Sequence, residues 1–582
     1  MKEKKLLPEI QNWVYSVSQA FHKGSLVFNV FLLHCLKNDI PLPDLCDRKL
    51  YEHCILIGES SPPTINDDLK YVWQTYFKNF PRNPQLYRSH QAYNLAAGTY
   101  KTNFLNSLVT PFRGRQWKFI QAICKKCNVH RSWVYHIVRS INESTYQVEL
   151  PQEVRDFVTS ERAILGNPGF VDKNWLKLHK VEVLKYYYHI LKISEHHFNI
   201  KKFTLAPVCR IRSHSMTIDT DTLFGIVKNV FEEDIEAKNK GEFREKQDEY
   251  WKKYFDFSKL LPKRKFTGTI RTDGVSASIH FRVPKKEQTD SNSNSNPIKE
   301  LSKPTAPSRV IAIDPGRVNL IFGVERLPEG NLKTYKLTRK TYYNQSGMKK
   351  AKERSARWEK MIDQEEKIFR KISLKTTQIS KWVQFVRNYL RVYSVLWKEK
   401  TRKKWGQQRF RVFCLRKRTL DTFFNTMKSR TGEKPVIAYG AAKFKSTGTG
   451  EVAAPTTSLY KKCSDLFTTI PVDEHRTTRI CHDCDAPLLK VTKDKWILRG
   501  RVKNMLEWRA GELAKWNLGM MKLDREVRGL RWCGSTKCRT FKNRDLNAAL
   551  NILRCFTSEE RPENLSHKCP ALGDYKSLRL TR

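Results

Sequence analysis

The chain has 582 residues, well past the length at which one hydrophobic core stops growing, so we expect three or more domains. Hydrophobic residues make up 40% of the chain and aromatic residues 11%, which excludes a largely disordered protein. Its 108 Lys and Arg against 59 Asp and Glu give a net charge of +49. Such a charge attracts polyanions, and the nucleic-acid backbone is the usual one. We therefore expect a nucleic-acid-binding protein.

No stretch approaches about 18 uninterrupted apolar residues, so the sequence predicts no transmembrane helix and no membrane partner. Residues 1–11 are charged and lack the apolar core of a signal peptide. These features predict an intracellular protein, where thiols stay reduced. We expect its 14 cysteines to be free thiols or metal ligands rather than disulfides.

The N-terminal part of the chain predicts helices followed by a smaller β-rich region. Residues 1–200 show apolar residues at helical spacing. The pattern then shifts to shorter β-branched runs over Phe203–Val227, and a charged helix is predicted at Phe231–Lys253. Residues 266–283 predict a hairpin with Asp273-Gly274 as a two-residue turn. Residues 284–308, which include TDSNSNSNP, predict a linker.

After this linker, the pattern predicts an α/β region. Strands are expected at Arg309–Ile313 and Asn319–Val324, and Leu327–Gly330 turns into a third strand, an opening that an RNase H-like fold needs. A long helical region follows at Met348–Arg430. Residues 349–430 contain 25 Lys and Arg against 7 Asp and Glu, a balance of +18. An amphipathic helix with a solvated face explains the apolar spacing, but the charge excess favours a nucleic-acid-facing surface.

Two aspartates stand out as candidate metal ligands. Asp314 ends an apolar strand just before a glycine turn, and Asp545 lies at the start of a helix. Each has a plain alternative, because Asp-Pro-Gly often forms an ordinary turn and a helix N-terminus favours an aspartate cap. Phosphodiester hydrolysis by two metal ions, however, needs several carboxylates from distant parts of the sequence. Magnesium suits such a site, since it prefers oxygen ligands.

Four cysteines lie between these aspartates in two close pairs. Two residues separate Cys481 from Cys484, four residues separate Cys533 from Cys538, and 48 residues lie between the pairs. Four thiolates suit a closed, tetrahedral, structural zinc site, although His482 could replace one of them. The separation leaves room for a helix at Asn504–Leu518 inside the finger.

Taken together, these motifs carry a resemblance. Asp-Pro-Gly-x-x-Asn at 314–319 and Asn-Arg-Asp-x-Asn-Ala-Ala at 543–549, with cysteines between them, resemble the first and third RuvC motifs of TnpB transposon nucleases, Fanzor proteins and type V CRISPR effectors. Residues 337–347 and 439–455 are similar to Fanzor segments that follow the first motif and precede the finger. Residues 272–281 resemble a hairpin of the Fanzor wedge domain.

The middle carboxylate is where the sequence departs from TnpB proteins. Their glutamate follows an apolar strand some way before the zinc loop, but the matching strand here, Pro435–Gly440, has no carboxylate. A second strand is predicted at Phe467–Val472, followed by Asp473 and Glu474. A glutamate just before Arg-Thr and the zinc cysteines is typical of the Fanzor branch. We assign the role to Glu474, with Asp473 as the fallback; the alternative is that the middle carboxylate has been lost.

The resemblance implies a multidomain α/β protein. We expect a helical recognition region at 1–200, a β-barrel wedge domain at 201–283, a RuvC nuclease domain of RNase H-like fold at 309–474 and 543–582, and a zinc-finger insertion at 475–542 that binds target nucleic acid. It also implies a Mg²⁺-dependent DNA endonuclease, in which Asp314, Glu474 and Asp545 hold two Mg²⁺ ions. Cys481, Cys484, Cys533 and Cys538 hold structural Zn²⁺.

The implied partners are an omega RNA guide and double-stranded target DNA next to a short flanking motif. The resemblance further implies a monomeric ribonucleoprotein in the nucleus. Two other functions stay open: an inactive RNA- and DNA-binding protein of transposon origin, and a guide-independent TnpB-like protein. Cys124 and Cys127, with His130 and His136 nearby, could form a second metal site or belong to an ordinary helix face.

Overall fold

A computed structural model covers the chain. The residues that the structure describes are 3–57, 66–81, 90–196, 200, 202–231, 236–257, 264–282, 309–428, 434–441, 454–498, 520–567, 569 and 577–580. The predicted linker at 284–308 and the predicted helix at 504–518 lie outside them. The chain folds into two compact units: Met1–Gln288 with Arg354–Phe410, and Thr289–Glu353 with Arg411–Arg582. Helices and mixed sheets make this an α/β protein.

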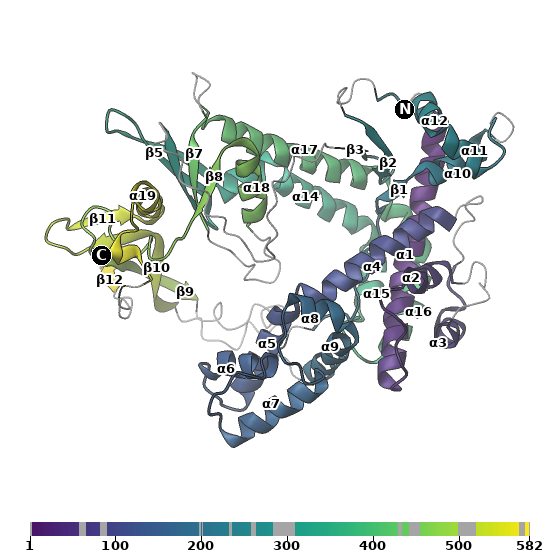
Figure 1. Ribbon diagram of the computed structural model, residues 1–582, viewed down its shortest axis with the longest axis horizontal. Helices are drawn as coiled ribbons and strands as arrows, with labels where there is room; N and C mark the ends of the chain where they lie inside the picture. Colours follow the sequence, from purple (N-terminus) through teal and green to yellow (C-terminus); the bar gives the residue numbers. More distant parts are fainter. Residues whose placement is uncertain are drawn as a thin grey trace. The chain divides into compact units, whose positions relative to one another are not determined.

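The first unit is mainly helical. Its helices before the β region are α1 (Leu6–Lys37), α2 (Arg48–Leu56), α3 (Asp67–Val72), a π-helical turn (Trp73–Phe77), α4 (His90–Val109), α5 (Phe112–Lys126), α6 (Trp133–Asn142), α7 (Gln152–Ile164), α8 (Lys173–Leu178) and α9 (Lys180–Glu195). α1 is buried on all sides over most of its length and packs against α2, α3 and α4 (Figure 1). It is therefore the central helix of this unit.

The β region of the first unit is a three-stranded antiparallel sheet. It consists of β1 (Met216–Ile218), β2 (Phe266–Thr272) and β3 (Ala277–Phe281), in that order. The predicted hairpin is confirmed, but its turn has four residues rather than two, since Thr272 pairs with Ala277. The Asp273 carboxylate explains the longer turn, because it accepts hydrogen bonds from the backbone N–H groups of Val275 and Ser276.

Three helices accompany this sheet: α10 (Thr220–Val230), α11 (Lys240–Glu245) and α12 (Gln247–Tyr254). The β-branched run predicted over Phe203–Val227 is thus mostly not strand, because Asp219 caps α10 by accepting from the N–H of Thr222. The single charged helix predicted at Phe231–Lys253 is also wrong. Asn239 caps α11 by accepting from the N–H of Glu242, so the first helix begins only at Lys240, and a break at Lys246 separates it from α12.

The predicted helical region Met348–Arg430 is divided in the same way. It contains α14 (Met348–Glu359), a 3-10 turn (Lys360–Ile362), α15 (Asp363–Arg370), α16 (Ile379–Lys400) and α17 (Lys403–Asn425). α16 packs in the first unit, where Trp397 meets Tyr15 and Tyr389 meets His22. The predicted nuclease segment 309–474 included these residues, whereas their apolar face belongs to the core around α1.

The second unit is built on a five-stranded mixed sheet of order β6-β5-β4-β7-β8. Its strands are β4 (Val310–Pro315), β5 (Asn319–Arg326), β6 (Leu332–Thr338), β7 (Val436–Gly440) and β8 (Thr469–Val472). β4, β5 and β6 form an antiparallel meander, while β7 and β8 run parallel to β4. The strands predicted from sequence on either side of Asp314, at 436–440 and before Asp473 are confirmed.

Helices cover both faces of this sheet (Figure 1). One face, with Ile311, Ile313 and Tyr439, packs against α13 (Arg339–Gln345), the second half of α17 and α18 (Thr456–Leu466). The other face presents Ala312 and Ala438 to α19 (Arg544–Thr557). Because side chains alternate along a strand, Asp314 and Gly440 share the face that α19 covers.

A second sheet in this unit has the order β11-β10-β9-β12. Its strands are β9 (Leu488–Leu498), β10 (Met520–Cys533), β11 (Thr540–Asn543) and β12 (Ser577–Leu580). β9 pairs antiparallel with β10, and β12 pairs parallel with β9. All four predicted zinc cysteines lie at or beside the ends of these strands, so the sheet and the cysteines form one finger-like element.

Candidate active site and metal centre

The three predicted catalytic carboxylates come from two strand ends of the five-stranded sheet and from the helix that covers one of its faces. Asp314 lies near the carboxyl end of β4, and Glu474 follows β8 after one intervening residue. Asp545 lies in the first turn of α19, the helix that covers this face. In open α/β sheets, ligands bind outside the carboxyl ends of parallel strands, where β4, β7 and β8 end together here.

Gly440 shows how Glu474 enters this site. Gly440 ends β7, and the preceding residue Tyr439 pairs with Ile313, the residue before Asp314. A Cβ atom on Gly440 would lie 2.7 Å from Cδ of Glu474 and in still closer contact with its Oε1. The glutamate carboxylate therefore lies directly over the Cα of Gly440, in the space of a missing side chain. β7 has no carboxylate of its own, but the carboxylate of Glu474, which follows β8, lies beside its last residue.

The plain alternative for Asp545, a helix cap, is excluded by its contacts. The cap of α19 is Asn543, whose side chain accepts from the N–H groups of Asp545 and Leu546. The carboxylate of Asp545 is held differently: Oδ2 accepts from Nδ2 of Asn319 at 2.6 Å, and Oδ1 accepts from Nε of Arg544 at 3.1 Å. Asn319 is the last residue of the Asp-Pro-Gly-x-x-Asn motif, so this hydrogen bond joins the two predicted motifs.

The electrostatics of the site are dominated by crowded acids. Asp314 is 5% exposed, and burial together with the charges of Glu474 and Asp545 raises its pKa well above its ordinary value. The positive charge of Arg544 lowers the pKa of Asp314. Because these negative charges repel one another and Asp314 is buried, the site is stabilised either by a proton on Asp314 or by a bound cation.

The donor set of these three residues consists of oxygen alone, which is the set that Mg²⁺ prefers. In the described part of the chain these three carboxylates are not among the side-chain groups close enough together to hold one metal ion. Ligands shared between two ions about 3.5–4 Å apart are spread more widely than ligands of one ion. The residue types therefore fit a magnesium site.

Asp473, the fallback for the middle carboxylate, makes contacts outside this group. Its Oδ2 lies 2.8 Å from Nε2 of His567, and its Oδ1 accepts from the N–H of His475. Arg561 donates to the backbone carbonyls of Asp473 and His475. Asp473 is also not among the groups that shift the pKa of Asp314, whereas Glu474 is. The contacts favour Glu474 as the residue that faces Asp314.

The cysteine quartet is the clearest metal site. The Sγ atoms of Cys481, Cys484, Cys533 and Cys538 lie within 4.8 Å of one another. Cys481 and Cys533 are buried, and all four belong to one small apolar cluster with Leu488. Among the described residues no other group of three or more His, Cys, Asp or Glu is as tight. A closed set of four thiolates fits structural zinc.

Two asparagines of α19 fasten the first cysteine pair to the helix that carries Asp545. Nδ2 of Asn547 donates to the carbonyls of Thr477 and Ile480 at 3.0 and 2.7 Å. Nδ2 of Asn551 donates to the same two carbonyls, both at 2.9 Å. Both asparagines are buried. They stand four positions apart and so share one face of the helix.

This attachment continues to Glu474 and to the cysteine loop. The N–H and the hydroxyl of Thr477 both donate to the carbonyl of Glu474, at 3.2 and 3.1 Å. On the other side, Arg554 of α19 forms two hydrogen bonds with Asp485, just after Cys484. α19 thus positions the backbone that carries both the catalytic candidate and the first zinc pair.

The sequence motifs contained Asn319 and Asn547, and Asn551 lies two residues beyond the second motif, but sequence reasoning gave none of them a role. An amide pair spaced by four on the buried face of a predicted helix is a signal for such a role, because a buried amide needs hydrogen-bond partners. The segment that it binds, Thr477–Ile480, is distant in sequence. Pattern alone could not identify it.

The second Cys-x-x-Cys pair does not form a cluster with its predicted histidines. Cys124 is buried in α5, Cys127 is exposed beyond its end, and burial raises the pKa of the Cys124 thiol. His130 contacts Ser132, and His136 contacts the hydroxyl of Tyr146. These contacts fit the reading of this pair as part of an ordinary helix.

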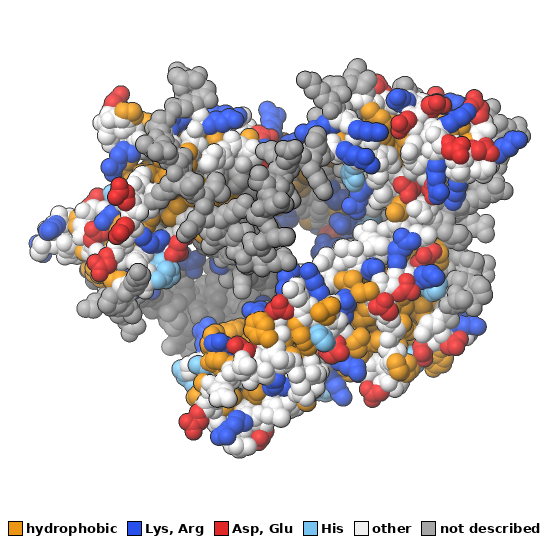
Figure 2. Space-filling model, viewed as in Figure 1, with side chains coloured by type: hydrophobic (Ala, Val, Ile, Leu, Met, Phe, Trp, Pro, Cys, Tyr) orange, Lys and Arg blue, Asp and Glu red, His pale blue; other side chains and the backbone are white. Residues whose placement is uncertain are grey.

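Basic side chains are spread over the surface of the described residues (Figure 2). On α16, Lys381, Arg387 and Arg391 are exposed while Trp382 and Tyr389 are buried, so this helix is amphipathic as expected. No helix of the described chain is long and apolar enough to cross a membrane.

Comparison with known proteins adds one match. Residues 216–283 match a family model described as a domain of unknown function, DUF8286, which covers β1 to β3 and their helices. No curated protein matches the chain.

Proposed function

We propose that this protein is a Fanzor-like, RNA-guided endonuclease that cuts double-stranded DNA by magnesium-dependent RuvC chemistry. The observation that carries this proposal is the position of Glu474. Its carboxylate lies over Gly440, and its charge, together with that of Asp545, raises the pKa of buried Asp314. The antiparallel opening of the five-stranded sheet, with Asp314 on its first strand, supports an RNase H-like fold.

The residues would divide the work as follows. Asp314, Glu474 and Asp545 would hold Mg²⁺ at the carboxyl ends of the strands, where the metal would supply activation of water and stabilisation of the leaving oxygen. Asn319 orients the Asp545 carboxylate by its hydrogen bond to Oδ2. Arg544 places a positive charge beside the acids, where a DNA phosphate has to approach them.

Other parts of the chain would bind the nucleic acids. The zinc finger of Cys481, Cys484, Cys533 and Cys538 contacts target DNA and fixes the loop before α19. The exposed arginines and lysines of α14 to α17 bind the omega RNA guide through its phosphates. Base pairing with the guide selects the DNA, and the helical and wedge-like regions recognise the short flanking motif. Basic clusters such as Arg402–Lys404 support nuclear entry of a monomeric ribonucleoprotein.

A cleavage assay tests this proposal. RNA that copurifies with the full chain is sequenced, and a plasmid library is built with the matching target beside randomised flanks. We expect Mg²⁺-dependent cleavage next to one short flanking motif. Asp314→Asn should abolish it, while Asp363→Asn, which changes an exposed aspartate of α15, should leave it intact. Cleavage that persists in Asp314→Asn contradicts the catalytic assignment.

A second candidate function is binding without cleavage. Two observations favour it: β7 lacks its own carboxylate, and both oxygens of Asp545 already accept hydrogen bonds from protein groups. A chain of this kind would retain its copurifying RNA and bind the matching DNA without cutting it at any Mg²⁺ concentration. Protein that purifies free of RNA would instead indicate the guide-independent TnpB-like alternative.

A further inference from the structure

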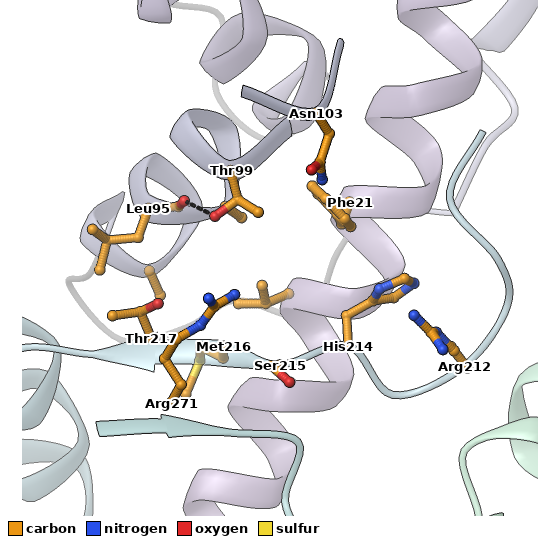
Figure 3. A pocket seen from close by; sticks show the side chains of 13 residues that line it. Phe21, Leu95, Thr99, Asn103, Arg212, His214, Ser215, Met216, Thr217 and Arg271 are labelled. Atoms are coloured by element: carbon orange, nitrogen blue, oxygen red, sulfur yellow. Dashed lines mark hydrogen bonds between the residues drawn. The ribbon is translucent and has the colours of Figure 1, made fainter. Parts of the chain in front are cut away.

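The first unit contains a cavity of about 200 Å³ between α1, α4 and the sheet strands β1 and β2 (Figure 3). Its apolar lining comes from Val17, Phe21, Ala92, Leu95, Ala96 and Met216. One aromatic ring, that of Phe21, belongs to this lining and stands edge-on to His214, with 5.2 Å between the ring centroids. The cavity can therefore accept a flat apolar group.

Polar side chains surround this apolar lining. Thr99 and Asn103 come from α4, and Thr217 and Arg271 come from paired strands. Figure 3 shows Arg271 at one side of the cavity, pointing toward Thr99, and Arg212 beside His214 at the other side. The cavity thus has a cation on each side and hydrogen-bonding groups between them.

These two arginines lack acidic partners. In the described part of the chain, neither Arg212 nor Arg271 forms an ion pair or a side-chain hydrogen bond. The nearby carboxylate of Asp273 is already taken by Arg409 at 3.1 Å and by its own turn. Partial burial and the charges of Arg409 and Arg210 lower the pKa of Arg212. Asp273 offsets the charge of Arg212 only in part, and both guanidinium groups are exposed to solvent, so an anion can reach two cations that have no partner of their own.

An apolar slot between two unpaired cations fits one kind of ligand in particular. A nucleobase is flat and apolar on its faces and carries hydrogen-bonding edges, and its strand has a phosphate on each side. An uncharged apolar ligand would leave both arginines unpaired, and a lone phosphate would leave the apolar lining unused. Base capture by aromatic side chains with flanking cations is a general mode of single-strand recognition.

We propose that this cavity captures one unstacked nucleotide of a single-stranded nucleic acid, with its base inside and its neighbouring phosphates at Arg212 and Arg271. Met216, Thr217 and Arg271 lie in the region matched by the family model of unknown function, so the site gives that region a specific task. The proposal uses no residue of the carboxylate site. It can therefore hold or fail independently of the nuclease.

Binding of two synthetic strands tests it. The full chain, freed of copurified RNA at high salt, is titrated with a fluorescently labelled eight-nucleotide strand that is abasic throughout, or abasic except for one central adenine. Base stacking contributes about 1–3 kcal/mol, so we expect the single base to tighten binding roughly 5- to 150-fold. RNA and DNA versions are compared, and a gain in either supports the proposal while telling which strand is captured.

Three variants locate the gain. Ala96→Leu fills the cavity but keeps both arginines, so it should remove the gain and leave binding of the abasic strand unchanged. Arg271→Ala should weaken binding of both strands and reduce the salt dependence. Arg282→Ala is the matched control, since this exposed arginine follows β3 outside the cavity; the gain should persist in it.

Asn103→Ala, at an exposed position of α4, provides a second cavity variant that does not alter the core. It should reduce the gain while the thermal unfolding of the protein stays unchanged. The proposal is overturned if the base adds nothing to wild-type affinity with either RNA or DNA. It is equally overturned if a folded Ala96→Leu protein keeps the full gain.

Discussion

The carboxylate of Glu474 occupies the space that a side chain on Gly440 would fill. Gly440 ends β7 and Glu474 follows the end of β8, and the glycine is needed because a Cβ would come within 2.7 Å of Cδ of Glu474 and 2.9 Å of Cδ of Pro315. A carboxylate missing from β7 is thus replaced by one from the end of β8. Under the proposed function, this relationship accounts for a site with three carboxylates although β7 supplies none of them.

Gly440→Ala should disable cleavage without unfolding the protein. The added methyl group displaces Glu474, and a shift of about 1 Å at a reacting group can cost roughly 100-fold in rate. The measurement is the single-turnover cleavage rate of the RNA-loaded protein. Gly529→Ala is the control, because a Cβ there meets no atom within 4 Å. Equal cleavage rates for Gly440→Ala and wild type would contradict the close approach of the Glu474 carboxylate to Gly440.

Asn319→Ala should weaken the site through Asp545. Without its hydrogen bond from Nδ2, the Asp545 carboxylate loses the contact that orients it, and second-shell losses of this kind typically cost 10- to 100-fold in metal affinity or activity. We expect a lower cleavage rate and a higher Mg²⁺ concentration at half-maximal rate. Asn331→Ala, at an exposed position before β6, should change neither.

Asn551→Ala should separate zinc binding from cleavage. The substitution leaves the four cysteines in place but removes two hydrogen bonds to the carbonyls of Thr477 and Ile480, which costs about 1–3 kcal/mol of local stability when such groups stay buried. Zinc measured by mass spectrometry should remain at one ion per chain, while cleavage slows because only Asn547 then holds the backbone that leads from Glu474 to Ile480. A variant with normal cleavage would show that this contact is dispensable.

Cys484→Ser should remove both zinc and cleavage. Structural zinc sites contribute folding energy directly, so loss of one thiolate releases the loop that leads back to Glu474. Cys555→Ser, a cysteine of α19 outside the quartet, should retain zinc and activity. RNA that copurifies with either variant should be unchanged, because the first unit does not contain the quartet.

The raised pKa of Asp314 predicts a pH-dependent stability difference in Mg²⁺-free buffer. Because the folded state holds this proton more tightly than the unfolded state, its stabilising contribution is complete below the ordinary aspartate pKa and is lost as the pH rises through the folded value. Asp314→Asn removes the ionisation. Its thermal unfolding midpoint should therefore exceed that of wild type at neutral pH and converge with it near pH 3. Added Mg²⁺ should stabilise wild type more than the variant.

The strands around the site could be predicted from sequence because their signals are local. Val310–Ile313 is an apolar run that leads into Asp314 and a glycine turn, and Val436–Gly440 is a second apolar run. The cysteine spacing likewise predicted the four thiolates that the structure brings together. The start of α19 was located correctly, although its cap is Asn543 rather than Asp545.

The remaining features depend on contacts between distant segments. The sharing of the Thr477 and Ile480 carbonyls by Asn547 and Asn551 joins residues about 70 positions apart. The packing of α16 into the N-terminal core depends on pairs such as Tyr15 and Trp397, which no periodicity reveals. The prediction of a two-residue turn at Asp273 was wrong, because the aspartate side chain accepts hydrogen bonds from two backbone N–H groups and so extends the turn.

The central claim is that Glu474 is the third carboxylate of a nuclease site. The most direct measurement is the Mg²⁺-dependent cleavage rate of RNA-loaded Glu474→Gln, beside Asp473→Asn as the neighbouring control. We predict that Glu474→Gln abolishes cleavage and keeps its copurifying RNA, whereas Asp473→Asn cuts at close to the wild-type rate. Cleavage by Glu474→Gln at the wild-type rate, or its loss only in Asp473→Asn, would contradict the claim.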